Sequence, residues 1–181
     1  MSRRDFLASC SLAVASAIIL PNERAFATAN TLFSADRSLS FYNLHTDEEL
    51  AITYWRNGRY KSAALADINY LLRDFRTGDI KKIDTKLLDL LYVLHNKVGA
   101  TEPFQIISGY RSPKTNAMLA RRSRGVAKHS QHILGKAVDI RLSECGLDCL
   151  HKAAVELRAG GVGYYPASDF IHVDVGRVRY W

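Results

Sequence analysis

Helical periodicity in the first half of the chain, followed by short β-rich runs, constrains the fold more than any other feature of this sequence. Apolar residues recur at helical spacing from Ser62 to Phe75 and again from Asp84 to Gly99, with Asp84 placed as an N-cap. We also expect an N-terminal hairpin from residues 38–44 and 50–55. Later runs alternate, with strands expected at 104–108, 137–141, 162–165 and 170–175 and helices at 114–122 and 147–158. This order of elements predicts an α+β fold.

The length and composition of the chain fit one globular domain preceded by a separate N-terminal segment. The chain has 181 residues, of which 48% are hydrophobic, and it shows no internal repeat. Residues 2–7, SRRDFL, precede an uncharged run from Ala8 to Leu20 and then the sequence AFA at 25–27. This pattern predicts a twin-arginine export signal over residues 1–27 and a single domain over residues 28–181. The uncharged run is shorter than the roughly 20 residues of a spanning helix, so we expect no stable membrane insertion after cleavage.

Residues 28–181 are basic, with 22 Lys and Arg against 16 Asp and Glu. Such a surface favours polyanionic partners, and its binding to them should weaken as salt rises. No aromatic-basic motif for nucleic acid is present, so we expect cell-wall polymer or lipid head groups instead. Two cysteines, Cys145 and Cys149, remain in this range. They could form a disulfide in an oxidising compartment, or stay as small thiols near a helix start, since their spacing is poor disulfide geometry in a regular helix.

The stretch SQHILGKAVD, residues 130–139, contains two residues that commonly bind metal. A catalytic zinc site typically has three protein ligands from His, Asp or Glu and a fourth position for water. His132, Asp139 and the distant His172 supply that number. Gly135 lets the backbone leave a loop and enter a strand, so that His132 and Asp139 can point at one centre. Spacing alone is only suggestive, because a lone His–Asp pair is more often a structural hydrogen bond.

Several motifs in one order give the chain a resemblance to a known family. They are NLHT from Asn43, ISGYRS, RSRGVAKHS, the pattern Ser130-x-His132-x-x-Gly135-x-Ala137-x-Asp139, RAGGVGYYP, HVD and the terminal Tyr180-Trp181. The chain resembles the zinc peptidases that are grouped with D-alanyl-D-alanine carboxypeptidases and the hedgehog-type fold, and more narrowly the exported murein endopeptidase K-like enzymes. The resemblance implies a small antiparallel sheet flanked by helices. It also implies that one Zn²⁺ is held by His132, Asp139 and His172.

The same resemblance implies roles for further residues. Arg111 matches the arginine that faces the substrate carbonyl in the family, and a fixed guanidinium can stabilise an oxyanion. Related enzymes often place an acidic residue three positions before the last His ligand, which is Asp169 here. Asp174 is the competing candidate, because residues two apart on a strand share a face and it would lie beside His172. Both Asp169 and Asp174 therefore remain candidate general bases, and we expect the other one to orient a ligand histidine.

These features predict a zinc-dependent peptidoglycan endopeptidase that hydrolyses peptide cross-links of the cell wall, with stem peptides as its partners. Two alternatives stay open at the level of sequence. One is a D,D-carboxypeptidase or dipeptidase that trims free stem-peptide ends, and the other is a non-catalytic wall-binding zinc module. The export signal and the resemblance together predict a location in the periplasm of a Gram-negative cell.

Overall fold

The computed structural model describes residues 36–123 and 125–181. The predicted export signal, residues 1–27, lies outside the described residues, as does the start of the predicted domain. Among the helices that are described, none combines the length and apolar character needed to cross a membrane.

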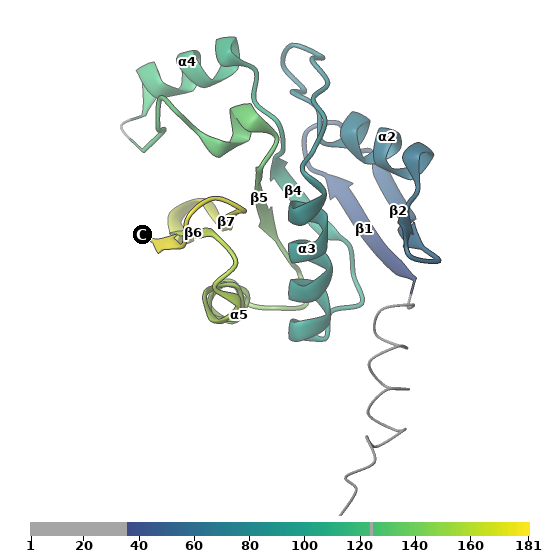
Figure 1. The fold of residues 1–181 in the computed structure, drawn as a ribbon. Helices are drawn as coiled ribbons and strands as arrows, with labels where there is room; N and C mark the ends of the chain where they lie inside the picture. Colours follow the sequence, from purple (N-terminus) through teal and green to yellow (C-terminus); the bar gives the residue numbers. More distant parts are fainter. Residues whose placement is uncertain (1–35, 124) are drawn as a thin grey trace, which may run out of the picture. The chain divides into compact units, whose positions relative to one another are not determined.

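An eight-stranded sheet forms the centre of the described part (Figure 1). Its strands lie in the order β3-β2-β1-β4-β5-β7-β6-β8, and their bounds are β1 Arg37–Asn43, β2 Glu49–Arg56, β3 Arg59–Tyr60, β4 Phe104–Ser108, β5 Ala137–Arg141, β6 Gly161–Tyr165, β7 Phe170–Asp174 and β8 Arg179–Tyr180. Most neighbours pair antiparallel, whereas β1 with β4 and β6 with β8 are parallel. The predicted α+β class is confirmed, and the two parallel pairs make the sheet mixed.

The described helices are α2 Ser62–Leu71, α3 Thr85–Val98, α4 Pro113–Arg122 and α5 Leu147–Leu157, with short 3-10 helices η1 Gln131–Leu134 and η2 Pro166–Ser168. Side-chain caps begin α3 and α4. The Asp84 side chain accepts from the Lys86 amide at the start of α3, and Gly99 ends that helix in the left-handed region. Ser112 caps α4 in the same way. Cys145 and Cys149 are free thiols at the start of α5.

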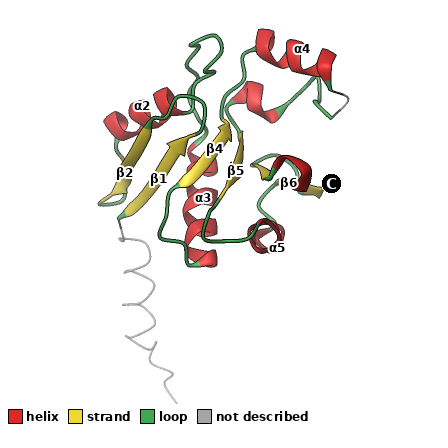
Figure 2. Ribbon diagram, turned by 180° about the vertical axis from the view of Figure 1, so that it is seen from behind, coloured by secondary structure: helices red, strands yellow, loops and turns green. Residues whose placement is uncertain are grey.

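The core lies between one face of the sheet and the helices. Helix α3 stands in front of the strands in Figure 1 and behind them in Figure 2. It contacts β1 and α5. Val138 and Ile140 of β5 and Val173 of β7 are buried in this core. Because side chains alternate along a strand, Asp139 and His172 point to the opposite face. Polar residues are therefore presented away from the helical layer.

Candidate metal centre

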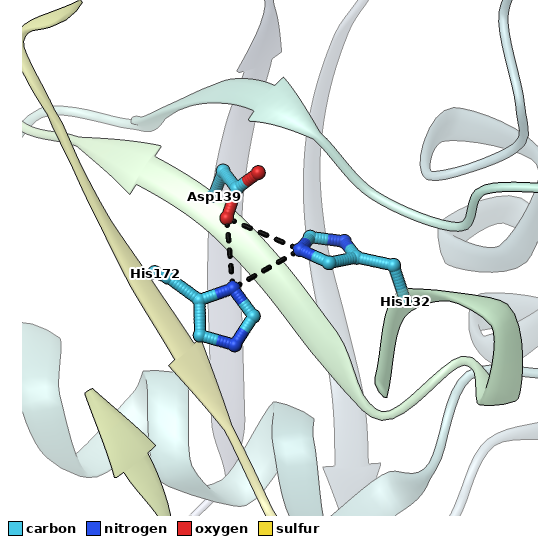
Figure 3. A group of neighbouring side chains, drawn as sticks. All are labelled: His132, Asp139 and His172. Carbon is cyan, nitrogen blue, oxygen red and sulfur yellow. Dashed lines mark hydrogen bonds and ion pairs between the residues drawn. The ribbon is translucent and has the colours of Figure 1, made fainter. Parts of the chain in front are cut away.

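His132 of η1, Asp139 of β5 and His172 of β7 point toward one another (Figure 3). His132 Nε2 lies 3.1 Å from both Asp139 Oδ1 and His172 Nδ1, and the last two atoms are 2.9 Å apart. All three residues are buried. Asp139 and His172 lie directly opposite each other in the antiparallel pairing of β5 and β7. The structure thus brings together the three residues that the sequence indicated as metal ligands.

The turn between η1 and β5 places His132 over the strand. Gly135 ends η1 with φ of 67°, a left-handed conformation that other residues adopt at a cost. A Cβ atom at this position would lie 2.5 Å from the Lys82 carbonyl oxygen. The Ser130 side chain accepts from the His132 amide, which caps the short helix at its start. Ser130 and Gly135 therefore fix where the backbone presents His132.

The outer nitrogen of each histidine is already occupied. His132 Nδ1 lies 2.7 Å from the Gly109 carbonyl oxygen, which can only accept, so this nitrogen carries the proton. His172 Nε2 lies 2.9 Å from the Asp174 carboxylate and donates to it. In the neutral imidazoles the inner nitrogens, His132 Nε2 and His172 Nδ1, are consequently lone-pair acceptors. Together with Asp139 Oδ1 they form three converging acceptors, an arrangement that a cation satisfies.

The distances also fit a metal ion. An ion bound tetrahedrally at the usual zinc distance of about 2.0–2.1 Å holds its ligand atoms roughly 3.4 Å apart. The three acceptor atoms here are 2.9–3.1 Å apart, so a shift of a few tenths of an ångström would accommodate the ion. Two histidines and one carboxylate leave a fourth position for water, as in catalytic rather than structural sites.

Charge in the cluster supports the same interpretation. Burial lowers the pKa of His132, which favours the unprotonated form that a metal ligand requires. Burial would raise the pKa of Asp139, but His132, His172 and Arg111 hold it below its usual range. Burial opposes protonation of His172, yet the neighbouring carboxylates Asp139 and Asp174 outweigh burial and raise its pKa. The carboxylates of Asp139 and Asp174 therefore favour a positive charge within the cluster.

Asp174 binds the nitrogen of His172 that faces away from Asp139 and His132. Its side chain is fully buried, and Oδ1 accepts from the amides of Gly161 at 3.1 Å and Gly176 at 2.8 Å. Arg179 Nη2 donates to Oδ2 at 2.6 Å. Burial would raise the pKa of Asp174, but the hydrogen bonds from His172 and Arg179 lower it. Asp174 is thus a fixed anion that orients the ring of His172.

Arg111 lies beside the metal cluster and lines the cleft above it. Its Nη2 pairs with Asp139 Oδ2, the oxygen that does not face the histidines. Its Nε donates to Ser108 Oγ at 2.8 Å, and its backbone amide donates to the His132 carbonyl at 3.3 Å. Among the described residues Nη1 has no hydrogen-bond partner, so this end of the guanidinium is available to a ligand in the cleft.

Asp169 is placed differently from the other predicted residues. It follows η2 in a left-handed conformation with φ of 52°, and its side chain is 63% exposed. Its Oδ2 pairs with Arg141 Nη1 at 2.8 Å, and both residues line a second cavity. The structure does not bring the Asp169 carboxylate to the metal ligands, although its neighbours Ser168 and Phe170 line the main cleft.

An open cleft of about 260 Å³ lies over the cluster. One wall is formed by Ser123, residues 125–127 and residues 129–131, which include the exposed His129. The other wall is aromatic: the rings of Tyr165 and Phe170 stack at 4.7 Å, and Trp181 Nε1 donates to Tyr165 Oη at 2.8 Å. One wall is thus polar and the other apolar.

Phe170, Arg179 and Trp181 line this cleft but were not identified from the sequence as site residues. A faint signal was present for Trp181. The backbone at Gly163 runs so close to it that a Cβ there would lie 2.7–2.8 Å from the Trp181 ring. A glycine within a strand can mark such a close approach, yet the sequence does not say which residue approaches.

Comparisons with known proteins identify the family. A family model described as peptidoglycan L,D-endopeptidase MepK matches residues 32–181. The peptidoglycan L,D-endopeptidase MepK of Escherichia coli (strain K12) is 45% identical over 180 residues, which are 99% of this chain and 97% of that protein. The probable peptidoglycan L,D-endopeptidase MepK of Haemophilus influenzae is 44% identical over 146 residues, 80% of this chain and 78% of that protein. The resemblance found in the sequence is confirmed: the chain belongs to the MepK family of M15 peptidases.

Proposed function

We propose that this protein is a zinc-dependent peptidoglycan L,D-endopeptidase that hydrolyses a peptide cross-link between stem peptides. The observation that carries the proposal is the buried cluster of His132, Asp139 and His172, whose three acceptor atoms converge at the floor of an open cleft. The names of the relatives support the choice of substrate and bond. Zinc held by these residues would polarise the scissile carbonyl and lower the pKa of a bound water.

Arg111 is placed to stabilise charge on the substrate. One end of its guanidinium is held by Asp139 and Ser108, which fixes its orientation before a substrate arrives. The other end, Nη1, faces no partner among the described residues. We propose that Nη1 donates a hydrogen bond to the oxygen of the scissile carbonyl as negative charge develops on it. A donor that is oriented in advance stabilises such charge most strongly where water is excluded.

Of the two carboxylates considered for proton transfer, we assign the task to Asp169. Asp174 is fully buried and orients His172, so it acts through that ligand. Asp169 lies between Ser168 and Phe170, which line the cleft, and its carboxylate forms a surface ion pair with Arg141, a kind of pair that contributes little. In this proposal, substrate binding releases the carboxylate from Arg141 and lets it turn toward the cleft. Catalytic hydrogen bonds often form only when substrate binds.

The charges of the cleft favour an endopeptidase over an enzyme that trims free ends. A trimming enzyme needs a cation that is free to bind a terminal carboxylate. Two arginines line the cleft, and each pairs with a carboxylate: Arg111 with Asp139, and Arg179 with Asp174. The open end of Arg111, Nη1, is the one that we assign to the scissile carbonyl. Among the described residues the cleft therefore offers no further free arginine for a terminal carboxylate, which supports cleavage within a cross-link.

We further propose that residues 1–27 form a twin-arginine export signal, that residues 28–181 form the single peptidase domain, and that the enzyme works in the periplasm. The support is the sequence pattern of the N-terminal segment together with the wall polymer named for the relatives. Peptidoglycan lies outside the cytoplasmic membrane, so an enzyme that cuts it must be exported.

The proposal is tested by incubating the protein without residues 1–27 with isolated peptidoglycan and resolving the products by mass. Cross-linked dimers should be lost and matching monomers should appear, and neither should happen with a chelator or with His132→Ala. Intact cross-links with loss of single terminal residues would show a carboxypeptidase instead. Binding to the wall without any metal-dependent product would show a non-catalytic module. Product masses identify the bond that is cut.

A further inference from the structure

The segment that builds the polar wall of the cleft contains no acidic residue. Between Glu102 and Asp139 the sequence has neither Asp nor Glu, but it has seven cations: Arg111, Lys114, Arg121, Arg122, Arg124, Lys128 and Lys136. The structure gathers positive charge at this end of the molecule. The pKa of Arg76 is lowered by burial and by the nearby cations Arg111 and Arg122, although Asp74 opposes this. The segment is therefore a strongly basic part of the surface next to the active site.

Another cavity, distinct from the one beside Asp169, lies on the far side of that wall, and we call it the α4 groove. It has a volume of about 360 Å³. Its floor is apolar, formed by Pro113, Ala117 and Ala120 with Ile133, and Arg121 and Lys128 line it as cations. Helix α4 stands apart from the helices of the core, near η1, in Figures 1 and 2. An apolar floor with two cations is typical of a site for an anionic ligand that has aliphatic parts.

The loop from 127 to 133 separates the α4 groove from the cleft. Ala127 and His129 line the cleft, whereas Lys128 and Ile133 line the groove. The Asn116 side chain fixes this loop to α4, because its Nδ2 donates to the carbonyl oxygens of Ala127 at 3.1 Å and Lys128 at 3.4 Å. Asn116 is buried. A ligand in the groove and one in the cleft would therefore lie on opposite sides of this loop.

The two cations of the groove are available to a ligand. Arg121 and Lys128 are exposed, and among the described residues neither side chain takes part in an ion pair or a hydrogen bond. This sets them apart from Arg111 and Arg179, which pair with carboxylates in the cleft. Unpaired cations lose no existing partner when a carboxylate binds.

We propose that the α4 groove binds a stem peptide of the wall other than the cross-link that is being cut. The inference rests on the proposed function. Stem peptides carry free carboxylates, which suit Arg121 and Lys128, and small aliphatic side chains, which suit the apolar floor. They recur throughout the polymer, so a second contact raises the effective concentration of cross-links at the cleft.

The test compares two double variants with equal loss of charge. Arg121→Gln/Lys128→Gln removes the cations of the groove. Arg59→Gln/Lys61→Gln removes two exposed cations beside β3, at the far edge of the sheet from β8. Binding to insoluble peptidoglycan is measured by co-sedimentation in a His132→Ala background, so that the wall stays intact. We expect the groove variant to bind roughly three- to thirtyfold more weakly than the parent, and the control variant to change by less than about twofold.

A second measurement uses the same double variants with His132 retained. kcat/KM for a soluble cross-linked peptide dimer, which occupies only the cleft, should be unchanged in the groove variant, while cleavage of intact wall should slow. Equal weakening of wall binding by both double variants, or none by the groove variant, would overturn the proposal.

Binding to vesicles that contain anionic lipid identifies a different ligand for the groove. If the groove variant lost only vesicle binding and kept wall binding, the groove would be a lipid site and the proposal would be wrong. A parent protein that binds the wall through the groove but cleaves neither substrate would instead refute the proposed function.

Discussion

Arg111 and Asp139 form an ion pair that joins the wall of the cleft to the candidate metal cluster. Asp139 uses its two oxygens for two tasks, with Oδ1 facing the histidines and Oδ2 facing Arg111. In the proposed mechanism the arginine thereby orients a metal ligand and is itself oriented toward the substrate. Loss of Arg111 should affect both metal binding and turnover.

Replacing Arg111 by Met should lower kcat by about 10²–10³-fold, the usual cost of removing one donor to an oxyanion. Zinc affinity should fall less, because the three ligand atoms remain. Arg111→Lys keeps the charge but cannot reach Ser108 and Asp139 together, so it should recover only part of the rate. Steady-state kinetics and zinc content of the purified variants measure the two effects separately. Wild-type turnover in Arg111→Met would remove the assigned role.

Asn substitutions at Asp169, just before β7, and at Asp174, at the end of β7, should give different results. Asp174→Asn leaves His172 without its carboxylate partner, so zinc affinity should fall about 10–100-fold. Asp169→Asn should keep zinc and lose turnover, because it removes the proposed proton acceptor. Arg141→Gln is the control for Asp169, since it removes the ion pair but keeps the carboxylate. If Asp169→Asn turned over like the wild-type protein with zinc bound, proton transfer would have to be assigned elsewhere.

Removing the metal should abolish hydrolysis and also lower thermal stability. Binding at a metal concentration one hundredfold above the dissociation constant contributes about 2.7 kcal/mol to folding. A chelator should therefore lower the Tm, and added zinc should restore both the Tm and activity. Calorimetry and an assay on the same samples test this. Activity that persists after the metal content has been shown to be negligible would contradict a metal-dependent mechanism.

Asp74 should make stability depend on pH in the acidic range. Its buried carboxylate accepts from the amides of Ser112 at 2.9 Å and Arg76 at 3.0 Å. Burial would raise the pKa of Asp74, but hydrogen bonds from Thr115, Ser112 and Arg76 lower it. A lowered folded-state pKa stabilises the protein above the unfolded-state pKa of about 3.9, and this stabilisation is lost as the pH falls through the folded-state value.

Asp74→Asn should accordingly cost about 1–3 kcal/mol of unfolding free energy at pH 7, and the difference from wild type should shrink below about pH 4. Denaturant titrations at pH 7, 5 and 3.5 measure this difference. Asp79→Asn, at an exposed position in the same loop, serves as the control. A difference that stays constant down to pH 3.5 would show that the charge on Asp74 is not its source.

The sequence was sufficient to predict elements that carry local signals. Helix α3 begins after Asp84 and ends at Gly99, as the capping residues indicated, and β4 and β5 have the predicted bounds. The two-residue strands β3 and β8 carry too few residues for a periodic pattern. The parallel pairing of β1 with β4 depends on contacts between segments some sixty residues apart, for which a single sequence gives no sign.

Those parts of the site that depend on residue type could be predicted from the sequence. The direction in which the backbone points a side chain could not. His132, Asp139 and His172 are residue types that bind metal, and the structure brings them together. The direction of Asp169 depends on its left-handed conformation after η2, which residue type does not reveal. Asp74 gave no signal at all, because its contacts with Ser112 come from a distant part of the chain.

The position of Asp139 opposite His172 makes the proposed metal centre depend on one alignment of β5 with β7. A slip of a single residue would turn one partner toward the hydrophobic core and dismantle the ligand set. The third residue, His132, comes from before the turn at Gly135, so the set also depends on how that turn presents η1 to β5. A chain in which β5 and β7 are misaligned would therefore lack the proposed metal site, and with it the hydrolytic activity that we propose.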